Sequence, residues 1–432
     1  MEKLQPIAIV SGARTPLAKA FTDLRDLSAV DLGIQAVTDA LRRCDLQPSD
    51  IDELVMGNVS GQPDAANLAR VIALGTNIPN DRIAHTVNRN CASGMESIIG
   101  AWHSLQQRRS NIVIAGGTES MSNVPLLYQK RTAEKFMKLG RAKKMLGRLK
   151  LMASFRPKHF KPIIGLQLGL TDPTCGLNMG QTAEILANEF SISRQEQDEY
   201  ALLSHQKALA AQEKCFLSGE IAAVKIGDKV VDKDNGPRQG QSLQQLQKLR
   251  TIFDKEGSVT AGNSCPITDG AAALVLARPS ELEKFEAPPL GFITHYAIAG
   301  CDPRRMGLGP VYATSKLLKQ TGWTMDDFDL IEINEAFAAQ VIACQKAAGS
   351  TEFCKSELGL SSAMGGFEPD KINLHGGAIA LGHPVGTTGT RIVLTLLRAL
   401  KATGGRRGLA TCLLYTSPSP RDLSTSRMPS SA

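Results

Sequence analysis

Short apolar runs of strand length alternate along this chain with longer segments of helical periodicity. Residues 7–10, 53–57 and 111–115 have the length and composition of buried strands, and two glycines follow the last of them. Between the first two runs, residues 28–43 carry apolar positions at helical spacing. This alternation is typical of an α/β protein built on a sheet.

The second half of the chain repeats the order of elements found in the first. A helix, a turn and a strand within residues 31–58 recur within residues 312–334. Asp52 and Asp329 occupy matching places in the two segments, about 277 positions apart. Several matches in the same order favour a duplicated half rather than coincidence.

The internal repeat and the shifts in composition divide the chain into segments. We expect an N-terminal half at 1–122 that is completed by about 255–285, an inserted loop domain at 123–254, a second half at 286–412, and a tail at 413–432. In the last seventeen residues, eleven are Ser, Thr or Pro without periodicity. Such a composition predicts a disordered tail, because it buries too little apolar surface to offset the entropy of ordering.

Composition narrows the class of protein. Of 432 residues, 42% are hydrophobic and 21% charged, which is typical of a globular chain. No apolar run approaches the length of a membrane span, and the N-terminus has no secretory pattern. The nine cysteines are scattered without a C-x-x-C pair, which argues against a disulfide framework or a structural zinc site. We therefore predict a cytoplasmic protein without a metal site.

Charge is concentrated in one segment. Residues 130–161 contain twelve Lys or Arg and one acid, whereas the whole chain carries a net charge of only +7. This distribution argues against general binding of nucleic acid. The apolar residues of the segment recur at roughly helical spacing, which predicts a basic amphipathic stretch. Anionic lipid, a partner subunit and a phosphorylated substrate all fit it, and the alternative is a solvated helix with no partner.

Cys91 is the strongest local candidate for chemistry. A strand-like run at 84–87 precedes it, and an apolar helical face begins at Met95. This places Cys91 at a helix N-terminus, where free N–H groups and the helix dipole favour a thiolate. The alternative is a cysteine that only packs in the core.

Two further motifs contain candidate polar groups. His383 lies within 375–389, where five glycines and a proline let the backbone approach a ligand closely. A histidine there is suited to accept a thiol proton, although the loop alone is equally consistent with a structural turn. Asn334 follows a strand-like run and either caps the next helix or orients a water. The loop at 260–264, with 269–273 after it, is either substrate-facing or a turn.

Taken together, these motifs resemble the thiolase family. The resemblance rests on Asn90–Gly94, 260–273, Asn334–Phe337 and 377–384, and covers about residues 5–411. The basic insert makes the chain most similar to the β-subunit thiolases of fatty-acid oxidation complexes. The resemblance implies two duplicated α/β halves in a layered αβαβα arrangement with an inserted helical loop domain. It implies an acyl-CoA C-acyltransferase that cleaves 3-ketoacyl-CoA with CoA in fatty-acid β-oxidation.

The resemblance also assigns roles. Cys91 resembles the nucleophile that forms an acyl thioester, His383 the base, and Asn334 the residue that holds a water in the oxyanion hole. Four residues match substrate-contacting positions: Met179, Asn263, Ser264 and Phe337. Cys265 stands where a serine commonly faces the pantetheine. The family uses CoA and acyl-CoA as substrates without a resident cofactor, and it implies a homo-oligomer, with a hydratase/dehydrogenase α-subunit and peripheral membrane contact through 130–161 as further expectations.

The end of the chain departs from the family pattern. Thiolases carry a second cysteine followed by a Gly-rich turn, whereas Cys412 stands one position early and no Gly-Gly follows. A one-residue shift within a strand turns a side chain to the opposite face. We therefore hypothesise that the sequence beyond Thr411 is non-native and that the chain acylates Cys91 but turns over poorly. The alternatives are an impaired acyl-CoA-binding or scaffold subunit and a decarboxylating ketoacyl synthase, which Asn334 disfavours because a histidine is usual there.

Overall fold

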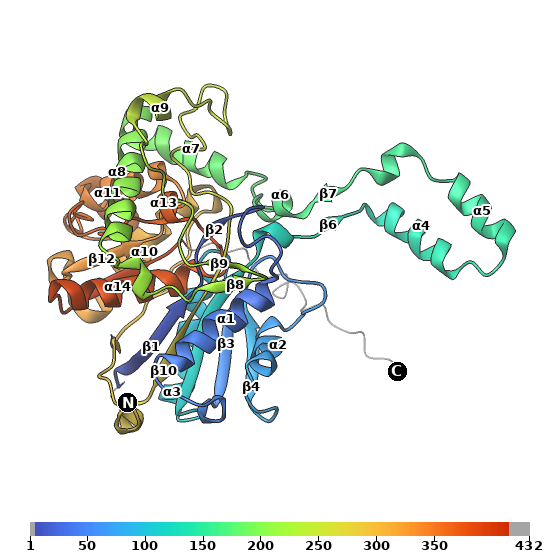
Figure 1. The fold of residues 1–432 in the computed structure, drawn as a ribbon. Helices are drawn as coiled ribbons and strands as arrows, with labels where there is room; N and C mark the ends of the chain where they lie inside the picture. The colour runs from blue at the N-terminus through green and yellow to red at the C-terminus, as the bar shows by residue number, and fades with distance from the viewer. Residues whose placement is uncertain (1–4, 414–432) are drawn as a thin grey trace, which may run out of the picture.

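The computed structural model describes residues 5–413, and its main body is built on a seven-stranded mixed sheet (Figure 1). The strands of this sheet are β1 (Ile7–Arg14), β2 (Ala18–Lys19), β3 (Glu53–Gly57), β4 (Ile83–Val87), β5 (Ile112–Glu119), β10 (Thr268–Ala277) and β11 (Gly291–Ile293). They lie in the order β11-β1-β10-β5-β3-β4, with β2 on β10. The central strand β10 runs antiparallel to both of its main neighbours, β1 and β5.

A second sheet lies in the C-terminal half. Within the described residues it consists of β12 (Leu330–Ile333) and β13 (Gly408–Thr411), which pair in parallel. The remaining strands form two small hairpins: β6 (Leu126–Leu127) with β7 (Ile163–Ile164), and β8 (Val224–Ile226) with β9 (Lys229–Val231).

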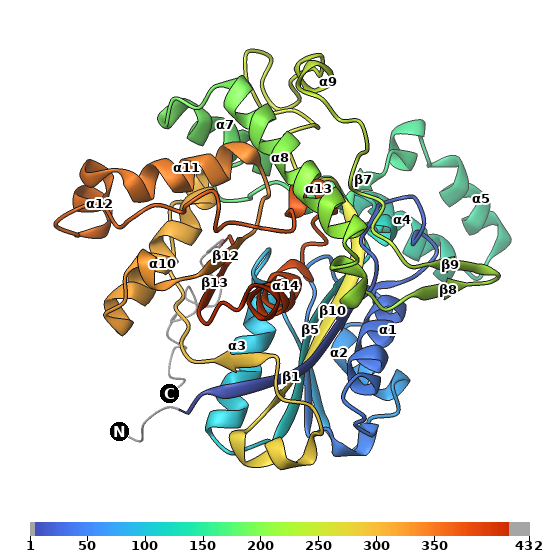
Figure 2. The same ribbon diagram turned by 60° about the vertical axis from the view of Figure 1, so that its left-hand side comes forward.

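The helices form three layers around the two sheets (Figure 2). Their bounds are α1 (Ala29–Arg42), α2 (Leu68–Gly75), α3 (Ser93–Gln106), α4 (Lys130–Arg141), α5 (Met145–Ala153), α6 (Gly165–Gly169), α7 (Met179–Glu189), α8 (Arg194–Glu213), α9 (Leu243–Gln247), α10 (Gly309–Thr321), α11 (Ala338–Gly349), α12 (Thr351–Leu358), α13 (Ala378–Leu381) and α14 (Thr388–Thr403). Helices α1 and α2 cover one face of the large sheet, and α3 and α14 cover the other. Because α14 also contacts β12 and β13, the predicted αβαβα layering is confirmed.

The repeat found in the sequence of the two halves is also present in their structure. The carboxylate of Asp52 accepts the backbone N–H groups of Asn111 and Ile112 at 2.7 and 3.2 Å. The carboxylate of Asp329 accepts those of Arg406 and Arg407 at 2.7 and 2.9 Å in the same manner. Each aspartate thus fixes the start of the neighbouring strand. Strand β3 therefore corresponds to β12, and β5 corresponds to β13.

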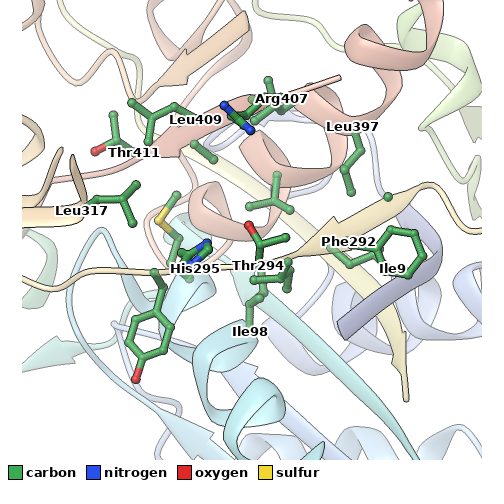
Figure 3. A pocket seen from close by; sticks show the side chains of 18 of the residues that line it. Ile9, Ile98, Phe292, Thr294, His295, Leu317, Leu397, Arg407, Leu409 and Thr411 are labelled. Carbon is green, nitrogen blue, oxygen red and sulfur yellow. The ribbon is translucent and has the colours of Figure 1, made fainter. Parts of the chain in front are cut away.

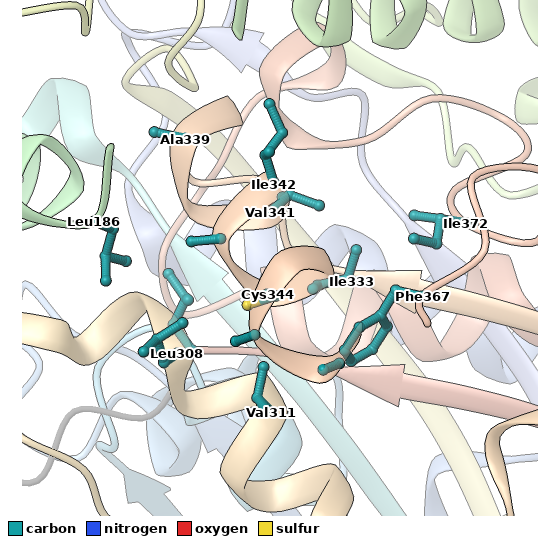
Figure 4. Close-up of a cluster of buried hydrophobic side chains, with 14 of the residues drawn as sticks. Leu186, Leu308, Val311, Ile333, Ala339, Val341, Ile342, Cys344, Phe367 and Ile372 are labelled. Atoms are coloured by element: carbon teal, nitrogen blue, oxygen red, sulfur yellow. The ribbon is translucent and has the colours of Figure 1, made fainter. Parts of the chain in front are cut away.

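A hydrophobic core fills the space between α7, α10, α11 and the small sheet. Figure 4 shows Val341 and Cys344 of α11 packed among side chains such as Leu186, Val311 and Phe367. Leu413, the first residue of the predicted tail, is buried in this core. The rest of that predicted tail, 414–432, lies outside the described residues.

The basic segment projects from the body as an arm (Figure 1). Strands β6 and β7 pair at its base, and α4 and α5 form its outer part. The predicted single amphipathic stretch is therefore two helices. On α5, Met145 and Leu146 are 77% and 82% exposed. No helix among residues 5–413 is long and apolar enough to cross a membrane.

Candidate active site

Cys91 lies in the turn between β4 and α3. The Ser93 hydroxyl accepts the Arg89 backbone N–H at 2.8 Å and donates to the Asn90 carbonyl at 2.7 Å. Asn90 takes a left-handed conformation with φ of 46°, which asparagine tolerates better than most residues. The turn therefore holds Cys91 two residues before the first helical residue, with its side chain only partly exposed.

The thiol of Cys91 is not poised as a thiolate. Burial raises its pKa to about 12, with a smaller contribution from the nearby carboxyl of Glu119. Burial therefore acts against the charged form that the helix N-terminus is expected to favour. Ionisation of Cys91 requires a base that takes its proton.

The two ring nitrogens of His383 have different partners: Nδ1 faces Thr388 and Nε2 faces Asn334. Its Nδ1 lies 2.6 Å from the Thr388 hydroxyl, and that hydroxyl donates its only hydrogen to the Pro384 carbonyl at 3.0 Å. This arrangement fits a ring that donates Nδ1–H to the hydroxyl and keeps Nε2 unprotonated, next to the Asn334 amide. Burial, assisted by the positive charge of Arg391, lowers the pKa of His383 to about 3. The ring is thus neutral and able to accept a proton.

Asn334 joins the histidine to the second sheet. It follows β12, and its backbone N–H donates to the Thr411 carbonyl at 3.0 Å. Its amide Nδ2 lies 3.5 Å from His383 Nε2, whereas its buried Oδ1 has no partner among the described residues. Helix α11 begins later, at Ala338, with Phe337 in the capping position. The alternative that Asn334 caps this helix is therefore wrong.

Cys412 lies beside Cys91 despite its position in the sequence. It follows the last residue of β13, so the alternation of faces along a strand does not fix its direction. Its thiol donates to the Cys91 carbonyl at 3.0 Å. Burial raises its pKa, and a side-chain hydrogen bond from Asn334 opposes that shift. Cys91, Cys412, Asn334 and His383 therefore form one connected set of contacts.

The residues expected to contact substrate fall into two groups. Met179 and Cys265 border the same apolar cluster as Cys91, and burial together with the neighbouring Cys91 raises the pKa of Cys265. The amide of Asn263, in contrast, is occupied by the Thr260 backbone N–H, Asp198 and the Ser258 carbonyl. These bonds give Asn263 a role within its loop, and direct contact with a substrate stays a prediction.

The other two expected residues lie on the neighbouring backbone. Ser264 and Phe337 pair as an isolated antiparallel bridge, and the Ser264 hydroxyl donates to the Thr260 carbonyl at 2.6 Å. The ring of Phe337 packs edge-on against that of Phe253 at 6.1 Å. Substrate contact at these positions also stays a prediction.

Sequence reasoning missed Glu119, at the end of β5. Its buried carboxyl accepts the backbone N–H groups of Val59 and Ser60 at 3.1 and 3.0 Å and that of Gly386 at 2.9 Å. It thereby fastens the His383 loop to the large sheet. Burial raises the pKa of Glu119. No local pattern signals this role, because its partners lie far apart in the sequence.

The described residues contain no group of three or more His, Cys, Asp or Glu side chains placed to hold a metal ion. The candidate groups of the site are two thiols, a neutral imidazole and an amide. A thiol that passes its proton to a neutral imidazole is suited to nucleophilic attack on a carbonyl carbon.

Comparison with known proteins finds relatives that match most of the chain. The family models described as thiolase, N-terminal domain and thiolase, C-terminal domain match residues 7–280 and 287–416. A 3-ketoacyl-CoA thiolase of Colwellia psychrerythraea is 38% identical over 409 residues, which is 94% of this chain and 93% of that protein. One from Photorhabdus laumondii is 39% identical over the same shares.

Solved structures agree in fold. Bacillus anthracis acetyl-CoA acetyltransferase superposes with a TM-score of 0.82 at 33% identity, covering 96% of this chain and 97% of that one. Human mitochondrial 3-ketoacyl-CoA thiolase in complex with CoA superposes with a TM-score of 0.81 at 34% identity, covering 95% of each chain.

Proposed function

The chain belongs to the thiolase family, and on that premise we propose that it is a 3-ketoacyl-CoA thiolase that acts through an acyl thioester on Cys91. The observation that carries this proposal is the contact set in which Cys412 links Cys91 to Asn334, and Asn334 approaches His383 Nε2 at 3.5 Å. A soft nucleophile, a neutral base and an amide are what cleavage of a 3-ketoacyl-CoA needs.

In the first half-reaction, Cys91 Sγ attacks the C3 carbonyl carbon while its proton passes to His383 Nε2. The C2–C3 bond then breaks, which leaves the shortened acyl group on Cys91. The departing acetyl-CoA carbanion takes a proton, for which Cys412 is the candidate donor. The free Oδ1 of Asn334 is suited to hold a water against the developing oxyanion.

In the second half-reaction, CoA takes the place of acetyl-CoA. Its thiol gives its proton back to Cys412 and attacks the thioester carbonyl. The sulfur of Cys91 leaves and recovers its proton from His383. The products are acetyl-CoA and an acyl-CoA two carbons shorter, and every group ends in its starting state.

The test follows acylation and turnover in the same sample. The chain is mixed with a 3-ketoacyl-CoA, quenched early, and digested for mass spectrometry, while acetyl-CoA release is measured with and without free CoA. We expect acyl mass on the Cys91 peptide and steady turnover with CoA. Cys91→Ser and His383→Ala should each abolish both, and the exposed Cys215→Ser is the matched control. Acyl mass on another cysteine would contradict the proposal.

A second candidate is an acyl-CoA-binding or scaffold subunit with impaired turnover. It is favoured by the absence of a Gly-rich turn after Cys412 and by the fact that β13 has only one partner strand among the described residues. Rapid labelling of Cys91 without sustained release of product would support this candidate against the enzyme.

We also propose that the arm at 130–161 contacts an anionic lipid surface. Its twelve cations and its exposed apolar positions on α5, such as Leu146 and Met152 (82% and 59% exposed), form the combination that lies in a membrane interface. The competing proposal is that the arm contacts a hydratase/dehydrogenase α-subunit, and the same experiment separates the two.

Flotation with vesicles measures this contact. We expect binding to phosphatidylserine-containing vesicles and little binding to phosphatidylcholine vesicles. Charge reversal at Lys143, Lys144 and Lys150 should abolish it. Reversal at the exposed Lys225, Lys248 and Lys355 is the matched control. Equal binding by both triple variants, or binding to neither vesicle, would refute the lipid proposal and favour a protein partner.

The location of the protein in the cell and its oligomeric state stay predictions. The nine cysteines include no disulfide among the described residues, which agrees with the predicted reducing, cytoplasmic location. A homo-oligomer is expected from the family, and sedimentation of the purified chain measures it.

A further inference from the structure

The loop that carries His383, residues 375–387, is supported differently at its two ends. At its C-terminal end, the Gly386 N–H donates to Glu119 at 2.9 Å. A cavity of about 730 Å³ lies beside β13 and α14, and Figure 3 shows Leu397 among its side chains, but none of residues 375–387 lines it. The N-terminal end of the loop therefore depends on contacts away from this cavity.

These contacts centre on Glu335, the second residue after β12. Its carboxylate is buried and accepts four hydrogen bonds. Oε1 accepts the Tyr200 hydroxyl at 3.1 Å and the Asn373 side-chain amide at 2.7 Å. Oε2 accepts the Ser204 hydroxyl at 2.7 Å and the Ile379 backbone N–H at 3.3 Å. A carboxylate offers about four lone-pair sites, so the acceptor capacity of Glu335 is fully used.

The donors to this carboxylate come from distant parts of the chain. Tyr200 and Ser204 lie one turn apart on α8, in the segment predicted as an inserted loop domain. Ile379 belongs to α13, which ends two residues before His383. The Ser204 hydroxyl also accepts the Gly377 backbone N–H at 3.2 Å. The Glu335 carboxylate thus joins α8 to the segment that leads into the base.

Close packing is independent evidence for this junction. A Cβ on Gly377 would lie 2.2 Å from the Glu335 carboxyl carbon. Gly376 has a φ of 77°, and a Cβ there would lie 2.7 Å from the Ser204 carbonyl oxygen and from the Ala208 Cβ. A left-handed residue pressed against a helix is suited to glycine alone. The two glycines therefore let the loop reach both α8 and the carboxylate.

We propose that Tyr200 and Ser204 are positioning residues for the His383 imidazole, and that they act through the Glu335 carboxylate. The two hydroxyls hold the carboxylate, the carboxylate holds the start of α13, and α13 places the imidazole. Helix α8 thereby contributes to the site without a hydrogen bond to the imidazole, whose own partners are Asn334 and Thr388. The effect on catalysis rests on the proposed function, whereas the effect on the loop does not.

Apolar packing alone is the competing explanation for the placement of the loop. Ala208 of α8 shares one buried cluster with Leu381, and Ala201 shares another with Ile379. Tyr200→Phe removes one hydroxyl and retains these contacts, so it separates the two explanations. Removal of the hydroxyl also leaves a buried carboxylate oxygen with one donor fewer, which weakens its hold on the remaining partners.

Hydrogen exchange of the full chain tests the positioning without any need for activity. The peptide that spans 375–387 reports the backbone amides of the loop. We expect Tyr200→Phe and Ser204→Ala each to speed exchange there by about threefold or more, because the bonds that hold the loop are weakened. Tyr312→Phe is the matched control, since it loses a phenol–carboxylate bond of 3.0 Å to Glu357, away from the loop.

Acylation kinetics test whether the positioning acts on the base. The maximal rate of Cys91 acylation and the KM are measured by quenched mass spectrometry, with the 3-ketoacyl-CoA used to test the proposed function. Glu335→Gln should lower the maximal rate about 10- to 100-fold, and Tyr200→Phe about 3- to 10-fold, with little change in KM. Because both changes act through one carboxylate, the double variant should be no more than about twofold slower than Glu335→Gln alone.

Each result has a separate meaning. Unchanged exchange at 375–387 in both hydroxyl variants would overturn the proposal and leave apolar packing as the support. Faster exchange with an unchanged acylation rate would also overturn it, since the hydroxyls would then hold the loop without acting on the base. Multiplied losses in the double variant, or an equal loss in Tyr312→Phe, would show general destabilisation instead. If the parent chain is not acylated, the proposed function fails, whereas faster exchange in the two variants would still confirm that α8 positions the loop.

Discussion

At Cys91 two physical effects act on one thiol in opposite directions. The start of α3 lies two residues away and favours negative charge, whereas burial disfavours it and raises the pKa to about 12. Desolvation wins. Because His383 is also neutral, the resting site holds a protonated thiol and a free base rather than a thiolate and an imidazolium. The proton therefore moves only when a substrate arrives.

This state predicts an unusual pH profile for alkylation. Only the thiolate reacts, so the rate at which iodoacetamide modifies Cys91 should rise about tenfold per pH unit from pH 7 through pH 10 without reaching a plateau. Mass spectrometry of the Cys91 peptide measures this rate, and the exposed Cys215 in the same digest reports the activity of the reagent. A plateau near pH 7 would show a preformed thiolate and refute the neutral pair.

Thr388 determines which nitrogen of His383 carries the proton. Its hydroxyl accepts Nδ1–H at 2.6 Å, and a valine keeps the shape but not the acceptor. We expect Thr388→Val to lower kcat by about 10- to 100-fold, the range seen when the partner that orients a histidine is removed, with little change in KM. Thr395→Val, on the same helix away from the site, is the control. A change in KM alone would show that Thr388 acts in binding rather than in orienting the base.

Among the elements, α3 and α14 bring the two halves of the site together. Each begins beside the other with a glycine at the contact. A Cβ on Gly94 would lie 2.6 Å from the Thr390 backbone nitrogen, and one on Gly389 would clash with that of Met95. Close approach of these two helix starts therefore requires both glycines. It places the Cys91 turn beside the loop that holds His383.

Replacing one of these glycines should separate the helices. We expect Gly389→Ala to cost about 1–3 kcal/mol of unfolding free energy through overpacking, and to reduce turnover because the helices carry the site apart. Urea unfolding measures the first effect and steady-state kinetics the second. Gly100→Ala is the matched control, because its Cβ would meet only Val55 at 3.8 Å. That change should be neutral or stabilising. Equal loss in both variants would show a general helix effect instead.

The helices and strands of the site also show which features the sequence alone could predict. Periodicity predicted the helix within residues 28–43, which the structure has as α1, because an amphipathic pattern is local information. It also found Cys91, His383 and Asn334, whose motifs are short and contiguous. It could not find Glu119 or Thr388, because their roles depend on partners brought together only by packing. The direction of the Cys412 thiol was likewise not readable, since that residue lies beyond the end of β13.

At the scale of the whole molecule, the two halves share a plan and differ in the number of strands. The large sheet has seven strands, of which β11 comes from the C-terminal half, whereas the second sheet has two within the described residues. The active site straddles the boundary between the halves, with Cys91 and Glu119 on the N-terminal half and Asn334, His383 and Cys412 on the C-terminal half.

Stability in acid provides a test of how α8 packs against the Arg238 segment within the inserted loop domain. His205 of α8 is buried, and its Nδ1 accepts the Arg238 backbone N–H at 3.3 Å. Burial, with the positive charges of Arg238 and Lys19, lowers its pKa to about 4. Above pH 6.5 neither state binds the proton, whereas below it the unfolded chain does and the native chain does not. The stability that neutral His205 supports is thus complete above pH 6.5 and is lost as pH falls toward 4, at about 1.4 kcal/mol per pH unit.

The unfolding free energy of the parent chain should therefore drop about 2 kcal/mol more between pH 7.5 and pH 5 than that of His205→Gln, which has no proton to take up. Urea titrations of both chains at the two pH values measure the difference, in which the contributions of all other groups cancel. An equal drop in the two chains would mean that His205 binds its proton in the native state, and that the contact between α8 and the Arg238 segment opens in solution.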